Sequence, residues 1–142
     1  MGNDTRDSLG HLATLLVRLV VGGIFVAHGA QKLLGAFGGH GLQGTAAGFE
    51  QMGFVPGILW ATLAGGTELL GGLGLVVGFL TPLAALGLAI VMAVAVFKVH
   101  WAHGLFAQNG GFEYPLTLLV VNLALVIRGG GHFSLDAMWR KK

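Results

Sequence analysis

The sequence contains no cysteine and few charged residues, and both shortages narrow the class of protein. Without cysteine, the chain can form neither a disulfide framework nor a thiol redox centre. Only 10% of its residues are charged, whereas soluble domains average about 25%. A soluble chain of 142 residues would need more polar side chains to cover its large relative surface. The low charge therefore argues against a soluble protein.

Long basic runs and a regular glycine repeat are also missing. The eight Lys and Arg residues barely exceed the six Asp and Glu residues, so we expect no nucleic-acid partner. Disordered chains are poor in apolar residues, whereas 54% of this sequence is hydrophobic. The 26 glycines follow no Gly-X-Y period, which excludes collagen. The class that remains is an integral membrane protein, with the lipid bilayer as its surroundings.

Four apolar stretches cover residues 12–34, 58–79, 83–103 and 112–127. A helix needs about 20 residues to cross the hydrocarbon core, and the first three stretches are long enough. The fourth is short and requires local thinning of the bilayer or close packing among its neighbours. The sequence lacks the alternating pattern of a membrane β-barrel. It therefore predicts an all-α fold, a four-helix integral membrane bundle that forms a single domain over residues 1–142.

The polar connection over residues 35–57 is too long for a plain turn. Its segment 45–52 predicts either a short interfacial helix, with Phe49 and Met52 on one side, or a flexible glycine loop. The connections 35–57 and 104–111 contain no Lys or Arg. Because basic residues near helix ends favour the cytoplasm, we expect both termini to be cytoplasmic. The basic residues on which this orientation depends are Arg6, Arg128, Arg140, Lys141 and Lys142.

Small residues follow the faces that carry charge. Helices in a membrane associate through close backbone approach. At 100° per residue, Gly22 and Gly29 of the first stretch lie on the stripe of Lys32. The face of Glu68 in the second stretch carries Ala61, Ala64, Gly65, Gly71 and Gly72. We therefore expect the charged faces to point into the bundle.

Ionisable side chains within the stretches are the strongest functional signal. A charge at the bilayer centre costs roughly 2.5–3.5 kcal/mol, so each one needs a partner or a wet cavity. At a rise of about 1.5 Å per residue, Glu68 lies near the midplane and the others lie nearer the outer end. The sequence predicts a polar pocket in the outer half of the bundle, formed by His28, Lys32, Glu68, His100 and Glu113.

Structural roles are the alternatives for the same residues. His28 and Lys32 would then belong to a polar network, and Glu68 to an ion pair that only fixes helix register. Arg18, near the inner side, either anchors that interface or pairs with Glu68. Lys98 lies about 160° around its helix from His100, and we expect it to extend toward the interface.

His100 and His103 share one helical face and are the candidate metal ligands of the sequence. The sequence has no cysteine, no Glu-x-x-His pair and only six histidines. Membrane di-iron and haem proteins need denser ligand sets. We therefore expect no bound metal, and no motif for a flavin is present.

Polar and glycine motifs recur along the chain in a pattern typical of one protein family. The positions are Arg18, His28, Gly29, Lys32, Leu33 and Gly35, then Glu68, Gly71, Gly72, Gly78, Thr81 and Pro82, then His100, Gly104, Phe106, Asn109, Gly110, Gly111, Glu113 and Tyr114, and finally Ser134, Leu135 and Asp136. Taken together, these motifs resemble the DoxX family over residues 12–136. This family consists of small four-helix bacterial membrane proteins, so the resemblance implies a multi-pass protein of the bacterial plasma (inner) membrane. Relatives include the DoxD subunit of thiosulfate:quinone oxidoreductases, and others associate with sulfur-handling and oxidative-stress proteins.

The first functional hypothesis is a quinone-linked redox subunit, of the sulfur compound:quinone oxidoreductase type. A quinone headgroup has two carbonyl acceptors that become hydroxyls on reduction, so it needs hydrogen-bond donors and a proton relay. The cationic groups would also suit a small anion such as a sulfur oxyanion. The predicted residues are Glu68, Glu113 and His100 for catalysis, and His28, Lys32, Arg18 and Asn109 for ligand binding.

Two other classes of function remain open. Intramembrane Glu, His and Lys groups are equally typical of small-solute or proton-coupled transport, although the chain lacks the inverted repeats of many transporters. A membrane scaffold that binds a soluble enzyme would use the polar groups only to fix its fold. Either a homo-oligomer or a soluble redox partner would be compatible with these hypotheses.

Overall fold

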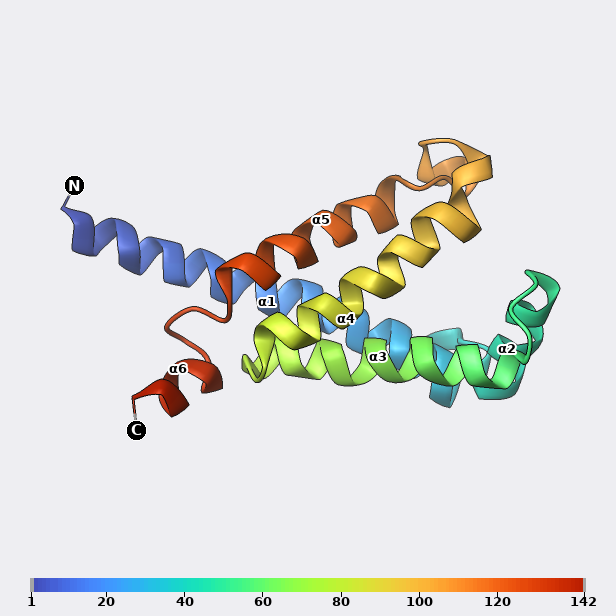
Figure 1. The fold of residues 1–142 in the computed structure, drawn as a ribbon, viewed down its shortest axis with the longest axis horizontal. Coiled ribbons are helices and arrows are strands. Elements are labelled where there is room, and N and C mark those ends of the chain that lie inside the picture. The colour runs from blue at the N-terminus through green and yellow to red at the C-terminus, as the bar shows by residue number, and fades with distance from the viewer. Residues whose placement is uncertain (1, 142) are drawn as a thin grey trace.

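The computed structural model describes residues 2–141, and these residues form helices without any β-strand. The four longer helices are α1 (Asn3–Leu34), α3 (Gly57–Val77), α4 (Thr81–Val94) and α5 (Glu113–Arg128). Two shorter helices, α2 (Gly41–Gln51) and α6 (Leu135–Arg140), lie at opposite ends of the molecule (Figure 1). The all-α prediction is confirmed for the described residues.

Three helical segments are long and apolar enough to cross a membrane: Asn3–Leu34, Gly57–Val77 and Thr81–His103. They confirm the first three predicted spans. The fourth predicted span corresponds to α5, which has 16 residues and is therefore only about 24 Å long. Its crossing of the bilayer stays a prediction.

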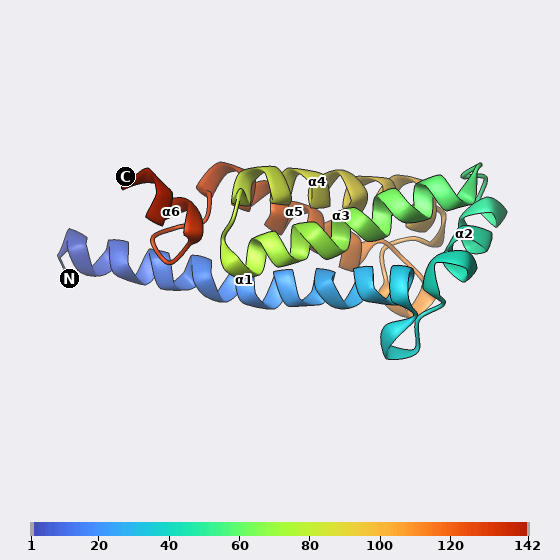
Figure 2. The same ribbon diagram turned by 90° about the horizontal axis from the view of Figure 1, so that it is seen from below.

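The helices pack as two antiparallel pairs, α1 with α3 and α4 with α5 (Figure 2). Glycines allow the first pair to come close, because a Cβ atom on Gly72 would lie 2.7 Å from the backbone nitrogen of Val26. The buried residues of α3 are Gly57, Ala61, Gly65, Glu68, Gly71, Gly72 and Leu75. Most of the small residues that were predicted to share a helix face with Glu68 are therefore buried.

Helices α3 and α4 join the two pairs and are close only near the tight turn between them. A Cβ atom on Gly74 would lie 3.2 Å from Ala84 Cβ, and one on Gly71 would lie 3.0 Å from Leu88 Cγ. Farther along, the two helices separate toward the end of the molecule that carries α2 (Figure 1). This separation opens the space for the site described below.

Several helix boundaries differ from the sequence prediction. Helix α1 begins at Asn3 rather than near residue 12. It extends beyond the apolar stretch because water can solvate the polar side chains of its exposed first turns. The third stretch is α-helical only to Val94 and continues as a π-helix over Ala95–His100 and a 3-10 turn over Trp101–His103. The connection 35–57 contains a helix, Gly41–Gln51, so the interpretation as a flexible loop is wrong.

The C-terminal helix α6 was not predicted. Its N-cap is Ser134, whose Oγ accepts a hydrogen bond from the backbone N–H of Ala137 at 3.1 Å. A serine before a short apolar and charged segment is a recognisable start signal. With only six residues, however, the helix is too short to give a periodic pattern.

Candidate functional site

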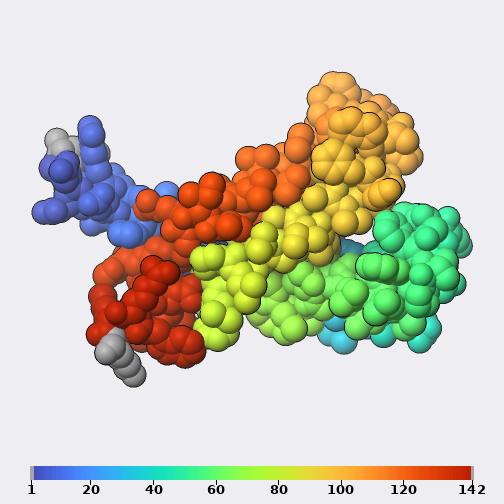
Figure 3. Space-filling model, in the orientation of Figure 1, coloured from blue at the N-terminus to red at the C-terminus, as the bar shows by residue number. Residues whose placement is uncertain are grey.

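A cavity of about 630 Å³ lies between the two helix pairs at the end that carries α2. Figure 3 shows a hollow between the yellow end of α4 and the green segment of α2 and α3. The lining is mainly apolar and aromatic, with only a few polar side chains. The polar or aromatic lining residues are Phe25, His28, Lys32, Phe49, Phe54, Trp60, Thr67, Glu68, His100 and Tyr114.

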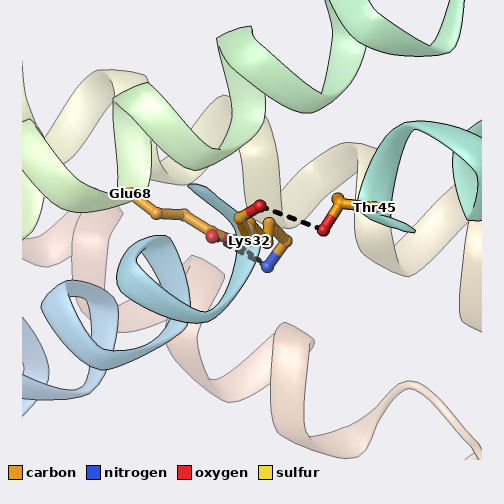
Figure 4. A network of polar contacts seen from close by, with 3 residues as sticks. All are labelled: Lys32, Thr45 and Glu68. Atoms are coloured by element: carbon orange, nitrogen blue, oxygen red, sulfur yellow. Dashed lines mark hydrogen bonds and ion pairs between the residues drawn. The ribbon is translucent and has the colours of Figure 1, made fainter. Parts of the chain in front are cut away.

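An ion pair between Lys32 and Glu68 forms part of the cavity wall (Figure 4). Lys32 Nζ lies 2.8 Å from one Glu68 carboxylate oxygen and 3.1 Å from the other. The Glu68 side chain is 4% exposed and that of Lys32 is 25% exposed. The ammonium group has three protons, so it can donate to a ligand as well as to the carboxylate.

The close-up also shows how this end of α1 is held. The Thr45 hydroxyl, from α2, donates to the backbone carbonyl of Lys32 at 3.1 Å (Figure 4). A carbonyl in the last turn of a helix has no partner within the helix, so Thr45 supplies one. Helix α2 thus ties the backbone of Lys32 to the wall of the cavity.

His28 lies one turn before Lys32 and also lines the cavity. Its ring centroid lies 6.4 Å from that of Tyr114, at an interplanar angle of 47°. Tyr114 belongs to the first turn of α5, so this contact brings α1 and α5 together across the cavity. Both side chains carry groups that can donate or accept a proton.

His100 lines the opposite wall, at the end of the π-helix. Its Nδ1 atom lies 2.7 Å from the carbonyl oxygen of Gly110. Since a carbonyl only accepts, Nδ1 carries the proton, and Nε2 of the neutral ring is left as an acceptor. Lys98 is exposed and does not line the cavity. This agrees with its predicted position, about 160° around the helix from His100.

Glu113 and Asn109 are not among the lining residues, which corrects the predicted pocket. Glu113 Oε1 accepts the backbone N–H of Ala107 at 2.8 Å and so holds the loop before α5. Asn109 is exposed in a 3-10 turn, where its backbone N–H donates to Phe106. The loop folds back on itself, and nothing in its sequence spacing revealed this.

Arg18 also lies away from the cavity and has no contact with Glu68. Its side chain is buried near the other end of the bundle, and it donates only to backbone carbonyls. The acceptors are Leu75 at 2.8 Å, Val76 at 3.1 Å, and both Gly130 and Phe133 at 2.7 Å. Neither role predicted for Arg18 is observed: instead of anchoring at the interface or pairing with Glu68, its side chain links α1 to α3 and to the C-terminal segment.

Asp136 completes this second cluster, and its role was missed from the sequence. Its two carboxylate oxygens accept the backbone N–H groups of Leu80 and Thr81 at 2.7 and 2.9 Å. An acidic side chain at this position caps the N-terminus of α4. The cap comes from a distant part of the chain, so no local pattern indicates it.

Within residues 2–141, no group of three or more His, Asp or Glu side chains is placed to share a metal ion. The polar side chains around the cavity can donate or accept hydrogen bonds and protons. They present one ammonium group, one carboxylate, two imidazoles and one phenol. The apolar remainder of the wall suits a ligand with a small polar headgroup.

Comparison with known proteins gives one family and several distant relatives. A sequence model described as DoxX matches residues 13–101. A Bacillus subtilis protein named "Putative oxidoreductase CatD" is 30% identical over 125 residues, covering 88% of this chain and 85% of that protein. No solved structure matches the chain.

Two Haemophilus influenzae proteins, both named "Uncharacterized protein", are also similar. One is 33% identical over 134 residues, covering 89% of this chain and 90% of that protein. The other is 35% identical over 79 residues, covering 56% of this chain. That match spans about half of the relative, 52% of its length.

Proposed function

Since the chain belongs to the DoxX family of membrane proteins, we propose that it is a quinone-linked redox protein whose cavity binds a quinone headgroup. The observation that carries this proposal is the Lys32–Glu68 ion pair in the wall of a largely apolar cavity. The name of the B. subtilis relative, an oxidoreductase, supports the reaction class.

A charged pair is an expensive way to fix helix register, and this favours a functional role. Two charges removed from water lose hydration that their mutual attraction only partly restores. The small residues of the α1–α3 contact already bring these helices together. The pair also faces the cavity, because the Lys32 side chain is 25% exposed. It can therefore serve a ligand as well as the fold.

In the proposed reaction, a quinone takes up two electrons and two protons to become a quinol. Lys32 Nζ donates to one quinone carbonyl, and Glu68 beside it relays a proton to the same oxygen. His100, when protonated at Nε2, donates to the second carbonyl and passes the second proton to it. Both protons come ultimately from bulk water. The proposed electron donor is a reduced sulfur compound: two thiosulfate ions lose one electron each and join through a new S–S bond.

We further propose that α5 is a fourth span and that both termini are cytoplasmic. The Lys32–Glu68 pair would then lie in the outer half of the bundle. The absence of Lys and Arg from residues 35–57 and 104–111, at the cavity end of the chain, supports this orientation. The named relatives come from bacteria, which supports the plasma membrane of a bacterium as the location.

Fluorescence of Trp60 provides a direct test of headgroup binding. Trp60 lines the cavity, whereas Trp101 and Trp139 do not. In a W101F/W139F background reconstituted in vesicles, a short-chain quinone should quench Trp60. We expect K32M to weaken this binding about tenfold, because a hydrogen bond from a charged donor is worth about 1.5–3 kcal/mol. E68Q should keep binding but slow quinol formation with thiosulfate.

Two variants serve as matched controls. K98M removes an exposed lysine outside the cavity, and D7N removes an exposed carboxylate near the N-terminus. Both should bind and reduce quinone like the parent. Equal quenching in K32M and K98M, or no quenching in the parent, would overturn the proposal.

A further inference from the structure

Helices α3 and α4 touch along only part of their length. Gly71 and Gly74 of α3 allow close approach to α4, and Gly87 of α4 faces Thr67, whose Cγ2 lies 3.2 Å from an ideal Cβ at that position. Beyond Thr67 and Gly87, toward the α2 end, the facing residues of both helices line the cavity instead. The contact between the helices thus ends where the cavity begins.

The residues beyond this contact are large, apolar and exposed. On α3, Leu63 is 51% exposed and Trp60 is 41% exposed; on α4, Ile90 is 58% exposed and Val94 is 41% exposed. All four also line the cavity. A residue that both lines a cavity and reaches the surface marks an opening. We call this opening, between Trp60, Leu63, Ile90 and Val94, the α3–α4 slot.

The slot opens between two helices that are long and apolar enough to span the membrane, so in a bilayer it would face lipid. Its rim carries no charged side chain among these four residues. The charged pair lies elsewhere in the wall, on α1 and α3. The cavity is therefore polar at one site and apolar along the path that leads sideways into the bilayer.

The cavity also reaches the surface at the α2 end, where Met52 lines it and is 47% exposed, but this approach is apolar and bordered by aromatic rings. The ring centroids of Phe49 and Phe54 lie 5.7 Å apart, and those of Phe54 and Trp60 lie 6.3 Å apart. Such contacts hold the rings together over this end. A water-soluble ligand arriving from that side would meet an apolar cover.

We propose that the substrate is a lipid-dissolved quinone with a long apolar chain, which enters sideways through the α3–α4 slot and leaves its chain there. This inference rests on the proposed quinone function. The headgroup passes between Leu63 and Ile90 and stops at Lys32, while the chain remains between Trp60 and Val94 and extends into the bilayer. The apolar rim lowers the free energy of the bound chain, as burial of each CH₂ group is worth about 0.8 kcal/mol.

The absence of native cysteine allows the route to be blocked at single positions. I90C at the slot, M52C at the α2 end and I127C on the far side of α5 each provide one exposed attachment point. Each variant, made in the W101F/W139F background and labelled with a bulky maleimide, is mixed with either a tail-less quinone or a decyl-chain quinone in vesicles. Quenching of Trp60 gives the rate and affinity of binding.

The label on I90C should weaken binding of the decyl-chain quinone about tenfold. It should slow entry of the tail-less quinone but leave its affinity within about twofold, because that quinone leaves no chain in the slot. The label on I127C should change the binding of neither quinone. Equal binding of the decyl-chain quinone with and without the I90C label, or a block of both quinones by the label on M52C alone, would overturn the slot.

If the unlabelled parent binds the tail-less quinone, the proposed function stands whatever the slot result. If it binds neither quinone, the proposed function fails first.

Discussion

At the scale of residues, the chain places its membrane-embedded charges in two separate groups. Lys32 and Glu68 neutralise each other beside the cavity. Arg18 has no carboxylate partner among its hydrogen bonds and is satisfied by four backbone carbonyls. An unpaired polar group in a membrane is costly. Lys32 and Glu68 avoid this cost by forming an ion pair, and Arg18 avoids it by donating to backbone carbonyls. Only the ion pair lies beside the cavity, where Lys32 can also donate to a ligand.

The bonding of Arg18 depends on its planar, forked guanidinium. R18K keeps the charge but cannot reach carbonyls on α3 and on the C-terminal segment together. We expect it to lower the free energy of unfolding by about 3 kcal/mol, because buried acceptors lose their donors. Thermal unfolding in detergent and proteolysis near residues 130–136 would measure this. R128K, which alters an exposed arginine, should change neither; equal effects of the two variants would contradict the bonding described.

At the scale of helices, close packing requires glycine on selected faces. A Cβ atom on Gly29 would lie 2.5 Å from the backbone nitrogen of Leu69, and a backbone atom cannot move aside as a flexible side chain can. The same helix has Gly23, around which a Cβ atom would meet nothing within 4 Å. The two glycines therefore have different roles in one helix.

The matched variants G29A and G23A test this difference. G29A should lower the free energy of unfolding by about 1–3 kcal/mol through overpacking. It should also widen the Lys32–Glu68 contact, which lies one turn away. G23A should be neutral or stabilising by up to about 1 kcal/mol, because alanine is the better helix former. Unfolding in detergent measures both, and a destabilisation by G23A as large as that by G29A would rule out the packing argument.

At the scale of the whole molecule, the number of crossings decides which side the termini occupy. Helix α5 has only 16 residues, fewer than the roughly 20 of a typical span, but it packs along α4, which belongs to one of the three candidate spans. Its polar Asn122 is buried, whereas Val120, Leu123 and Ile127 are exposed, so its outer face is mainly apolar. We therefore expect α5 to cross the bilayer together with α4.

Accessibility of single cysteines tests this topology. With four crossings, S8C and M138C lie on the same, cytoplasmic side and are protected from an impermeant maleimide added to intact cells. L105C, in the loop at the other end, should be labelled. All three positions are exposed in the folded chain. Labelling of M138C with protection of S8C would mean three crossings.

The sequence alone was sufficient for properties that depend on one helix at a time. Length and hydropathy gave the first three spans, and the 100° period gave the small-residue faces of Glu68 and Lys32. Depth along a helix follows from a constant rise per residue. His28, Lys32, Glu68 and His100, which were predicted to lie at similar depths, all line one cavity.

Only the tertiary structure decided which side chains meet, because that depends on which helices are neighbours and on how loops fold between them. Glu68 pairs with Lys32 rather than Arg18 since α1 runs antiparallel to α3, which brings the end of α1 beside the middle of α3. Glu113 turns back into its own loop, and Asp136 reaches α4 from the far end of the chain. The opening between α3 and α4 likewise arises because the two helices diverge. The sequence of each helix taken separately does not determine the angle between them.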